Sequence, residues 1–501
     1  MIMKKVYFLL FFVIFLNSCE EFLEEKPLNF YSPTTFYNTF EECQIAVNGL
    51  YDLIHNRALQ EGNYYAAYKL PAIMTDEMQW FERSRAPMRD VATCQYSSAS
   101  ETIYLYWSNT YKIINWANSV IVGIENSPIT REQKDSLIGE VRFIRGLFYS
   151  HLVNLFGDVP LLLKPTNSIT GNNVSRTPAL EVFDAIIDDL EFAEKHLPMQ
   201  QLDIGRVEKG AAQTMLAKVY LYRAGFPYYD ADSYQLAADK AKEIIANATN
   251  YGYRLLSDFS DVFRIGNDNN AESIFEIQYI GSVTESSSLT DYFFGISGTR
   301  EFGGSASSAY LVREFHESYK SGDLRRDWTV ADYRIVRGFI RPQKNPNLYK
   351  NAKYRNENPT NYGPQDSPKN FVVLRYSDVL LMAAEALSEA NGGPTPEAFE
   401  YINMVRRRAY GFDINTPNVV SDLSGLTKEE FRKAIIDERS WEFAGEGLRW
   451  YDLKRWKILV EKVRATTQDA APSIEEKHYF HPIPLNEIEI NPNLLPQNNG
   501  W

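Results

Sequence analysis

Apolar residues recur every three or four positions along most of residues 33–250, the spacing that places them on one face of a helix. Helices are predicted at about 33–56, 101–126, 131–156, 178–197, 208–225 and 233–247. The stripe of the first one consists of Phe36, Phe40, Cys43, Val47, Leu50 and Ile54. The pattern therefore predicts a succession of paired helices, packed like tetratricopeptide repeats but with irregular spacing.

Start signals support several of these helices. Thr130 with Gln133 forms a capping box, and Thr427 with Glu430 forms another further along the chain. Thr177 is predicted as an N-cap, with Pro178 at the first helical position.

The pattern changes after residue 250. Gly, Ser, Asn, Asp and Pro interrupt short apolar runs in 251–370, such as 274–277, so loops with a few short strands are predicted. Helices return at 371–391, 396–410 and 427–462, and a Pro- and Asn-rich tail over 478–501 is expected to be extended. The predicted fold class is mostly α, a tetratricopeptide-like helical scaffold with a loop-rich, weakly β middle region.

The first 18 residues are predicted to be an export signal. Lys4 and Lys5 precede an uninterrupted apolar run of 11 residues, which is too short to span a membrane. The run ends in Leu16-Asn17-Ser18-Cys19, which resembles a bacterial lipobox, so Cys19 is predicted to carry the lipid anchor. An ordinary cleaved signal with an incidental Cys19 is the alternative. The acidic stretch 19–32 is either a solvated tether or an export tag like those of Bacteroides surface lipoproteins.

Composition narrows the possible functions. The chain has 501 residues, a formal charge of −13 and three cysteines. The negative charge argues against a nucleic-acid partner and against attraction to anionic lipid. Three cysteines exclude a disulfide scaffold, although a Cys43–Cys94 bond stays possible beside the expected buried thiol at Cys43.

Catalytic and cofactor signatures are absent from the sequence. It has no nucleophile elbow, phosphate loop or dinucleotide fingerprint. His478 and His481 have no nearby cysteine, so no zinc site is predicted. The segment 268–272 faintly resembles the start of a calcium loop, but it lacks the later Gly and Glu and is expected to be a turn. We predict neither a metal nor a cofactor, and no enzymatic activity; a glycosidase-type carboxylate pair is the alternative.

Several segments together resemble the SusD/RagB family of nutrient-uptake outer-membrane lipoproteins. They occur in order along the whole mature chain: 141–149 with 156–160, 205–217, 375–387, 437–456, and 482–501 with its terminal Gly500-Trp501. The resemblance divides the chain into an N-terminal SusD-like region, 33–250, and a C-terminal RagB/SusD region, 251–501. The 437–456 block combines Asp437, Glu438, Arg439 and Arg449 with Trp441, Trp450 and Trp456, and we expect buried ion pairs braced by aromatic rings on one helix.

The resemblance implies a function. Family members have no catalytic activity; they are lipid-anchored on the outer membrane, facing outward, over a SusC-type TonB-dependent transporter barrel. They capture an oligosaccharide, or in some branches a peptide, and pass it inward. A purely structural lid that binds only the transporter is a further alternative.

Ligand residues cannot be transferred by motif, because the ligand face of the family is built from divergent loops. A sugar ring needs flat aromatic side chains for its C–H face and polar groups for its hydroxyls. Two loops offer both, at 71–100 and 286–308. The candidate ligand-binding residues are Asp76, Trp80, Phe81, Arg83 and Tyr96 in the first loop and Tyr292, Phe293 and Arg300 in the second. Trp80 is expected to be exposed and to stack on the ligand, and local packing of either loop onto the body is the alternative.

Overall fold

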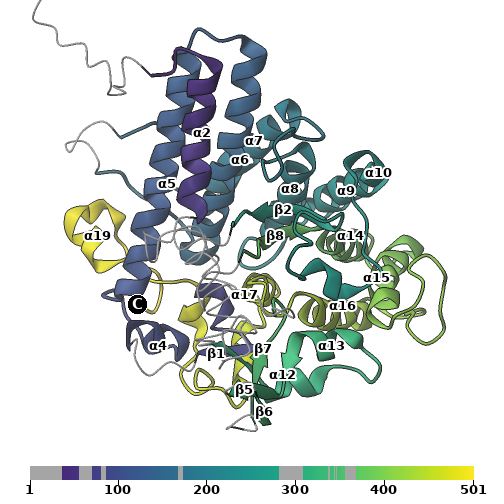
Figure 1. The fold of residues 1–501 in the computed structure, drawn as a ribbon. Helices are drawn as coiled ribbons and strands as arrows, with labels where there is room; N and C mark the ends of the chain where they lie inside the picture. Colours follow the sequence, from purple (N-terminus) through teal and green to yellow (C-terminus); the bar gives the residue numbers. More distant parts are fainter. Residues whose placement is uncertain are drawn as a thin grey trace, which may run out of the picture.

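The computed structural model describes residues 36–55, 70–80, 86–166, 173–280, 309–336, 339–342, 345, 347–355 and 368–501. The protein is mainly helical, as the sequence predicts, and its longer helices form a curved stack (Figure 1). In chain order the stack consists of α2 (Phe40–His55), α5 (Glu101–Asn126), α6 (Arg131–Phe156), α7 (Ala179–His196), α8 (Lys209–Ala224), α9 (Asp232–Ala246), α14 (Tyr376–Ala390) and α15 (Pro396–Ala409).

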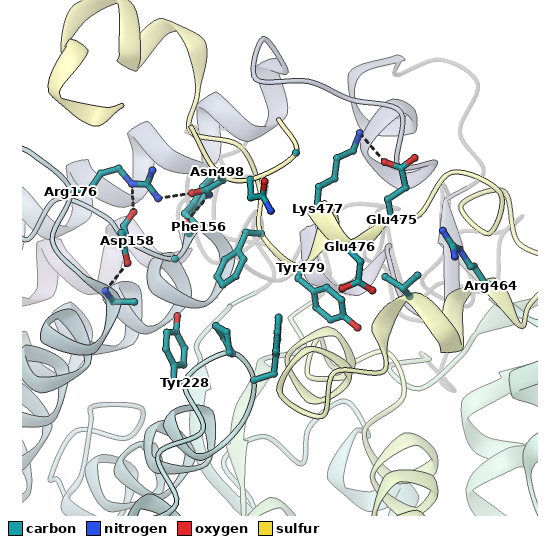
Figure 2. Close-up of a pocket in the computed structure, with 18 residues that line it drawn as sticks. Phe156, Asp158, Arg176, Tyr228, Arg464, Glu475, Glu476, Lys477, Tyr479 and Asn498 are labelled. Atoms are coloured by element: carbon teal, nitrogen blue, oxygen red, sulfur yellow. Dashed lines mark hydrogen bonds and ion pairs between the residues drawn. The ribbon is translucent and has the colours of Figure 1, made fainter. Parts of the chain in front are cut away.

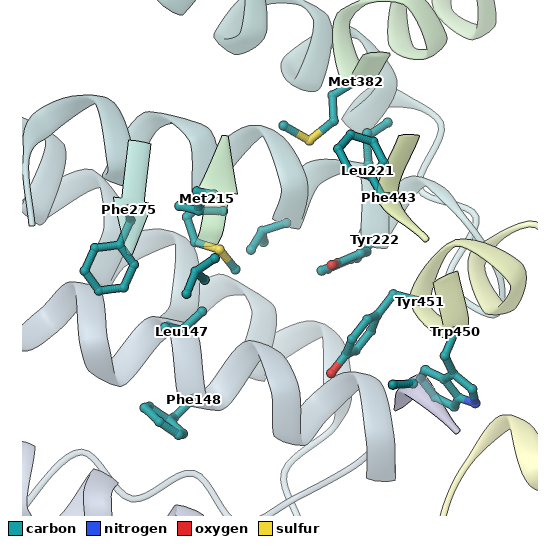
Figure 3. Close-up of a cluster of buried hydrophobic side chains, with 14 of the residues drawn as sticks. Leu147, Phe148, Met215, Leu221, Tyr222, Phe275, Met382, Phe443, Trp450 and Tyr451 are labelled. Atoms are coloured by element: carbon teal, nitrogen blue, oxygen red, sulfur yellow. The ribbon is translucent and has the colours of Figure 1, made fainter. Parts of the chain in front are cut away.

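Each helix of the stack from α5 onward packs against the next one in this order. The step from α9 to α14 passes over the whole loop-rich segment between them, so the C-terminal helices continue the N-terminal stack. One continuous hydrophobic core follows from this arrangement. It joins Phe148 of α6, Met215 of α8 and Met382 of α14 to Trp450 near the C-terminus (Figure 3).

The middle region supplies short strands. A four-stranded antiparallel sheet has the order β1 (Met78–Trp80), β3 (Ala309–Val312), β7 (Leu348–Asn351) and β4 (Val330–Ala331). Two antiparallel pairs lie outside it, β2 (Ser273–Ile277) with β8 (Phe371–Arg375) and β5 (Tyr333–Val336) with β6 (Phe339–Pro342). The remaining helices are α4 (Ala86–Ala92), α10 (Ala248–Tyr251), α12 (Arg313–Ser318), α13 (Leu324–Thr329), α16 (Lys428–Phe443), α17 (Arg449–Arg455), α18 (Leu459–Arg464) and α19 (Leu485–Ile490), and all of them except α16 are short. Single 3-10 turns occur at η2 (Phe259–Val262), η4 (Glu476–Tyr479) and η5 (Pro492–Leu494).

Local sequence signals are confirmed at several helix starts. The capping boxes at Thr130 and Thr427 both form, with side chain and backbone paired in each direction. At α7 the prediction is off by one residue, because Pro178 occupies the N-cap position. The missing cap is supplied from elsewhere: Asp158 Oδ1 accepts the backbone N–H of Ala179 at 2.9 Å.

Three predicted elements differ from the structure. The single helix expected over 427–462 is divided into α16, α17 and α18, since Gly445 and Gly447 take positive φ angles of 75° and 79° that a helix cannot continue through. The helix expected from 371 starts only at Tyr376, because Phe371–Arg375 pairs with β2. The tail contains η4, α19 and η5 and is not uniformly extended.

The predicted buried ion pairs of the 437–456 block are confirmed for Glu438, Arg439 and Arg449, although these residues lie on two helices and not on one, and Asp437 is only half-buried. Arg439 pairs with Asp378 and Asp452, and Glu438 pairs with Arg325 of α13. The Arg439 guanidinium also lies 4.9 Å from the ring centroid of Phe443.

Glu442 occupies the centre of a larger buried network. Arg325, Arg375 and Arg408 all contact its carboxylate. Burial opposes ionisation of Glu442, but these guanidinium groups outweigh it and hold the pKa of Glu442 well below its usual range. The network fastens α13, α15, α16 and β8 together, so its role is structural.

Both described cysteines are free thiols. Cys43 lies in the core as predicted, and the alternative of a bond to Cys94 is not realised. Burial raises the pKa of the Cys94 thiol to about 12, which keeps it protonated and unreactive.

Candidate functional site

The prediction of a single loop over 71–100 is wrong, because this range contains β1 and α4. The chain after Trp80 and the second candidate loop both adjoin the four-stranded sheet. β1 ends at Trp80 and β3 begins at Ala309, and the two strands pair antiparallel with Trp80 opposite Ala309. The chain that follows Trp80 and the chain that precedes Ala309 therefore leave the sheet at the same end. This register brings together two segments that lie far apart in the sequence. Five candidate ligand residues of these loops, Phe81, Arg83, Tyr292, Phe293 and Arg300, lie outside the described residues, as does Cys19.

Trp80 itself is buried, and the expectation that it is exposed is wrong. Its side chain is 2% exposed, and it shares one face of the sheet with Met78, Ala309 and Leu311, which are also buried. Charged neighbours in the sequence suggested a solvent-exposed position, but strand alternation turns this ring toward the core. A covered indole offers no free face to a sugar, so Trp80 is placed as an anchor of β1.

Asp76 is held by an ion pair. Arg449 Nε and Nη2 donate to its two carboxylate oxygens at 2.8 and 2.7 Å, a bidentate geometry. Next to it Glu77 is buried, and Ser440 Oγ donates to Glu77 Oε1 at 2.9 Å. Burial raises the pKa of Glu77 to about 8, against the opposing charge of Arg449. Both carboxylates thus tie the segment before β1 to α16 and α17.

Tyr96 lies away from the sheet and contacts the C-terminal tail. Its hydroxyl and His481 Nδ1 are 2.8 Å apart, and its ring centroid lies 4.8 Å from that of Trp501. The ring is almost fully buried. Of the predicted residues in the described part, then, Asp76 and Trp80 support the root of one loop, and Tyr96 supports the tail.

Sequence reasoning missed a polar and aromatic row on the opposite face of the same sheet. Gln79, Tyr310, Lys350 and Ala331 are successive cross-strand partners. Lys350 Nζ lies 3.7 Å from the ring centroid of Tyr310, which is half-buried. Burial lowers the pKa of Lys350 to about 7. The signal that could have found this row is the position of Tyr310, two residues after the second candidate loop.

Metal binding has no support in the described part of the chain, where no group of three or more His, Cys, Asp or Glu side chains converges. Residues 268–272 form turns, and their carboxylates are used in ion pairs: Asp268 with Lys369, and Glu272 with Arg375 and Arg408. Burial lowers the pKa of His481 to about 3, so this imidazole stays neutral at physiological pH.

None of the helices in the described ranges combines the length and apolar character that crossing a membrane requires.

Comparison with known proteins identifies the family. The chain is 30% identical, over 522 aligned residues that cover all of both proteins, to SusD-like protein P2 of Formosa agariphila. Two family models match, one described as the SusD family over residues 271–501 and one as "Starch-binding associating with outer membrane" over residues 21–221. The chain belongs to the SusD family.

Other SusD-family proteins extend the comparison. Starch-binding protein SusD of Bacteroides thetaiotaomicron is 23% identical over 91% of this chain and 89% of its own length. The crystal structure of a SusD homologue from the same organism is 26% identical, with a TM-score of 0.82 over 94% of this chain and 98% of that one. The resemblance drawn from the sequence motifs and the predicted fold class are thereby confirmed. The family consists of binding proteins without catalytic activity, in agreement with the missing catalytic motifs.

Proposed function

We propose that this protein is a cell-surface lipoprotein that captures oligosaccharide at the outer membrane and delivers it to a SusC-type TonB-dependent transporter. The observation that carries the proposal is the full-length relationship to SusD-like proteins, one of which is named as starch-binding. The lipobox at Cys19 supplies the attachment to the membrane.

The ligand face lies where the chain leaves β1 and enters β3. The pairing of Trp80 with Ala309 starts both candidate loops from one end of one sheet, and a buried Trp80 fixes that end to the core. Aromatic side chains for a sugar ring are available in the loops themselves, at Phe81, Tyr292 and Phe293. Arg83 and Arg300 supply donors for sugar hydroxyls.

Calorimetric titration tests the ligand class. The purified protein is titrated with neutral hexasaccharides (maltohexaose, laminarihexaose, cellohexaose and xylohexaose) and, in parallel, with a tryptic peptide pool. We expect one or more of the hexasaccharides to bind, and chromatography to show no shorter products. Binding of peptides alone would overturn the glycan assignment, and binding of neither would favour a purely structural lid.

A matched pair of variants tests the site. Replacing Tyr292 and Phe293 together with Ala removes two aromatic faces, and we expect affinity to fall by one to two orders of magnitude, since each stacked ring contributes about 0.5–1.5 kcal/mol beyond its buried area. Trp116 is a large aromatic residue outside the candidate loops, 48% exposed on α5, and Trp116→Ala serves as the control that leaves affinity unchanged. An equal loss of affinity in both variants would contradict a binding site at Tyr292 and Phe293.

The transporter is tested separately. Purification of the tagged protein from outer membranes in mild detergent is expected to recover a TonB-dependent transporter. Recovery of the protein alone, with that transporter present in the same membranes, would contradict the delivery role.

A further inference from the structure

A cleft of about 800 Å³ lies apart from the loop-bearing sheet (Figure 2). Its walls come from six segments: the exit of α6, the start of α7 with the residues before it, the turn between α8 and α9, α18, the segment around η4, and the end of the C-terminal tail. None of its lining residues belongs to β1, β3 or β7. The volume lies within the range of small-molecule sites, roughly 300–1,000 Å³.

Long-range contacts hold these walls in place. The backbone N–H of Phe226, in the turn after α8, donates to the carbonyl of Arg455 in α17 at 2.8 Å. Gly225 makes this approach possible, because a Cβ at that position would lie 2.6 Å from the same carbonyl oxygen. On the other side, Asn498 donates to the carbonyls of Phe156 and His481 at 2.8 and 2.7 Å. The cleft is therefore a built feature of the fold.

Aromatic rings line the floor of the cleft. Phe226, Tyr228 and Phe480 are half-buried, so each presents part of its ring to the cleft, and Tyr479 packs behind Phe226 with ring centroids 5.0 Å apart. The Tyr228 hydroxyl is itself covered, so the ring and not the hydroxyl is what this residue offers. Flat apolar surfaces of this kind suit the C–H face of a sugar.

The charges around the rim balance. Three carboxylates, those of Asp158, Glu475 and Glu476, stand against three cations, those of Arg176, Arg464 and Lys477. Figure 2 shows Asp158 and Arg176 on one side of the cleft and Glu476 and Arg464 on the other. The rim thus offers both donors and acceptors without excess charge, which suits a neutral, hydroxyl-rich ligand better than an anion.

Two side chains on the rim are available for hydrogen bonds to a ligand. Glu476 and Asn499 are both exposed and line the cleft, and each offers oxygen acceptors to ligand hydroxyls. By contrast, Arg176 is already engaged, because it donates to the carbonyls of Asp158 and Pro496 at 2.8 and 2.6 Å.

We propose that this cleft is a second carbohydrate-binding site, which takes a short segment of a neutral oligosaccharide independently of the loops on the sheet. The ligand class rests on the proposed function; the location rests on the cleft alone. Two sites on one molecule would allow a long glycan to be held at two points, which raises its apparent affinity through effective concentration.

Hydrogen–deuterium exchange of the full protein tests the proposal, with the same four hexasaccharides as probes. We expect slower exchange in peptides that cover 475–480 and 498–501 when a binding hexasaccharide is added. Glu476→Ala combined with Asn499→Ala should abolish this protection and weaken binding at the cleft by about tenfold or more, because the pair of changes removes one charge-assisted and one neutral hydrogen bond. Glu489→Ala, an exposed carboxylate on α19 outside the cleft, is the matched control.

The outcomes separate the two proposals. Protection of the candidate loops alone would overturn the second site and leave the proposed function intact. Protection of the cleft that survives the double substitution would overturn the assignment of the rim residues. No protection anywhere with any of the four hexasaccharides would overturn the second site together with the glycan assignment.

Discussion

Trp80 and Ala309 face each other as cross-strand partners of β1 and β3. The alanine has only a methyl group beside the large indole, and both side chains are buried. This one pair fixes the register that starts two distant loops from the same point, because a shift by one residue would turn the indole to the other face of the sheet. The geometry of the proposed ligand face therefore depends on a core contact.

Trp80→Ala should destabilise the protein. Removing a buried indole leaves a cavity and costs about 3–5 kcal/mol of unfolding free energy. We expect a clear fall in the thermal melting temperature, with Trp116→Ala on α5 as the exposed control that barely changes it. A melting temperature equal to that of the wild type would show that Trp80 is not an anchor.

Asp76→Ala should also destabilise the protein, since it leaves the Arg449 guanidinium without its bidentate partner. Breaking one side of a buried ion pair costs about 3 kcal/mol or more. Chemical denaturation measures the loss. The matched control is Glu317→Ala, which removes the partner of Arg313 from a pair whose side chains are 53% and 55% exposed, and it should cause little change.

Stability should fall on mild acidification because of buried histidines. Burial lowers the pKa of His481 to about 3 and that of His151 to about 3. An unfolded histidine has a pKa of about 6.5 and binds a proton below that pH, whereas the folded ones do not. The unfolded state thus takes up more protons between about pH 6.5 and pH 3, and the free energy of unfolding decreases as the pH falls through this window.

His481→Gln tests this dependence, because glutamine is polar but does not titrate. Denaturant titrations at pH 7.5 and pH 5 should show a smaller loss of stability in this variant than in the wild type. An unchanged difference between the two pH values would rule out His481 as a contributor.

Cys19→Ala should abolish membrane attachment. The lipobox predicts that this cysteine carries the lipid, so the variant is expected in the soluble fraction or as unprocessed precursor. Fractionation and metabolic labelling with a fatty acid measure the result. Normal acylation of the variant would falsify the assignment.

Much of the helical scaffold follows from the sequence by itself. Helix stripes, capping boxes and the buried position of Cys43 depend on residues within a few turns of one another, so short-range spacing is sufficient to predict them. The ordered motifs of the family and the ion pairs of the 437–456 block could also be read in advance. The partners of those ion pairs could not be predicted, because residues such as Asp76 and Arg449 lie far apart in the sequence.

The tertiary structure alone decided which aromatic residues are free to meet a ligand. Trp80 has charged neighbours in the sequence, yet pairing with β3 turns it into the core, and Tyr96 is covered by a tail more than 380 residues away. The cleft lined by Phe226, Tyr228 and Phe480 likewise exists only where six separate segments meet. Burial depends on what the fold brings against a side chain, and contacts between distant segments leave no periodic signal in the sequence.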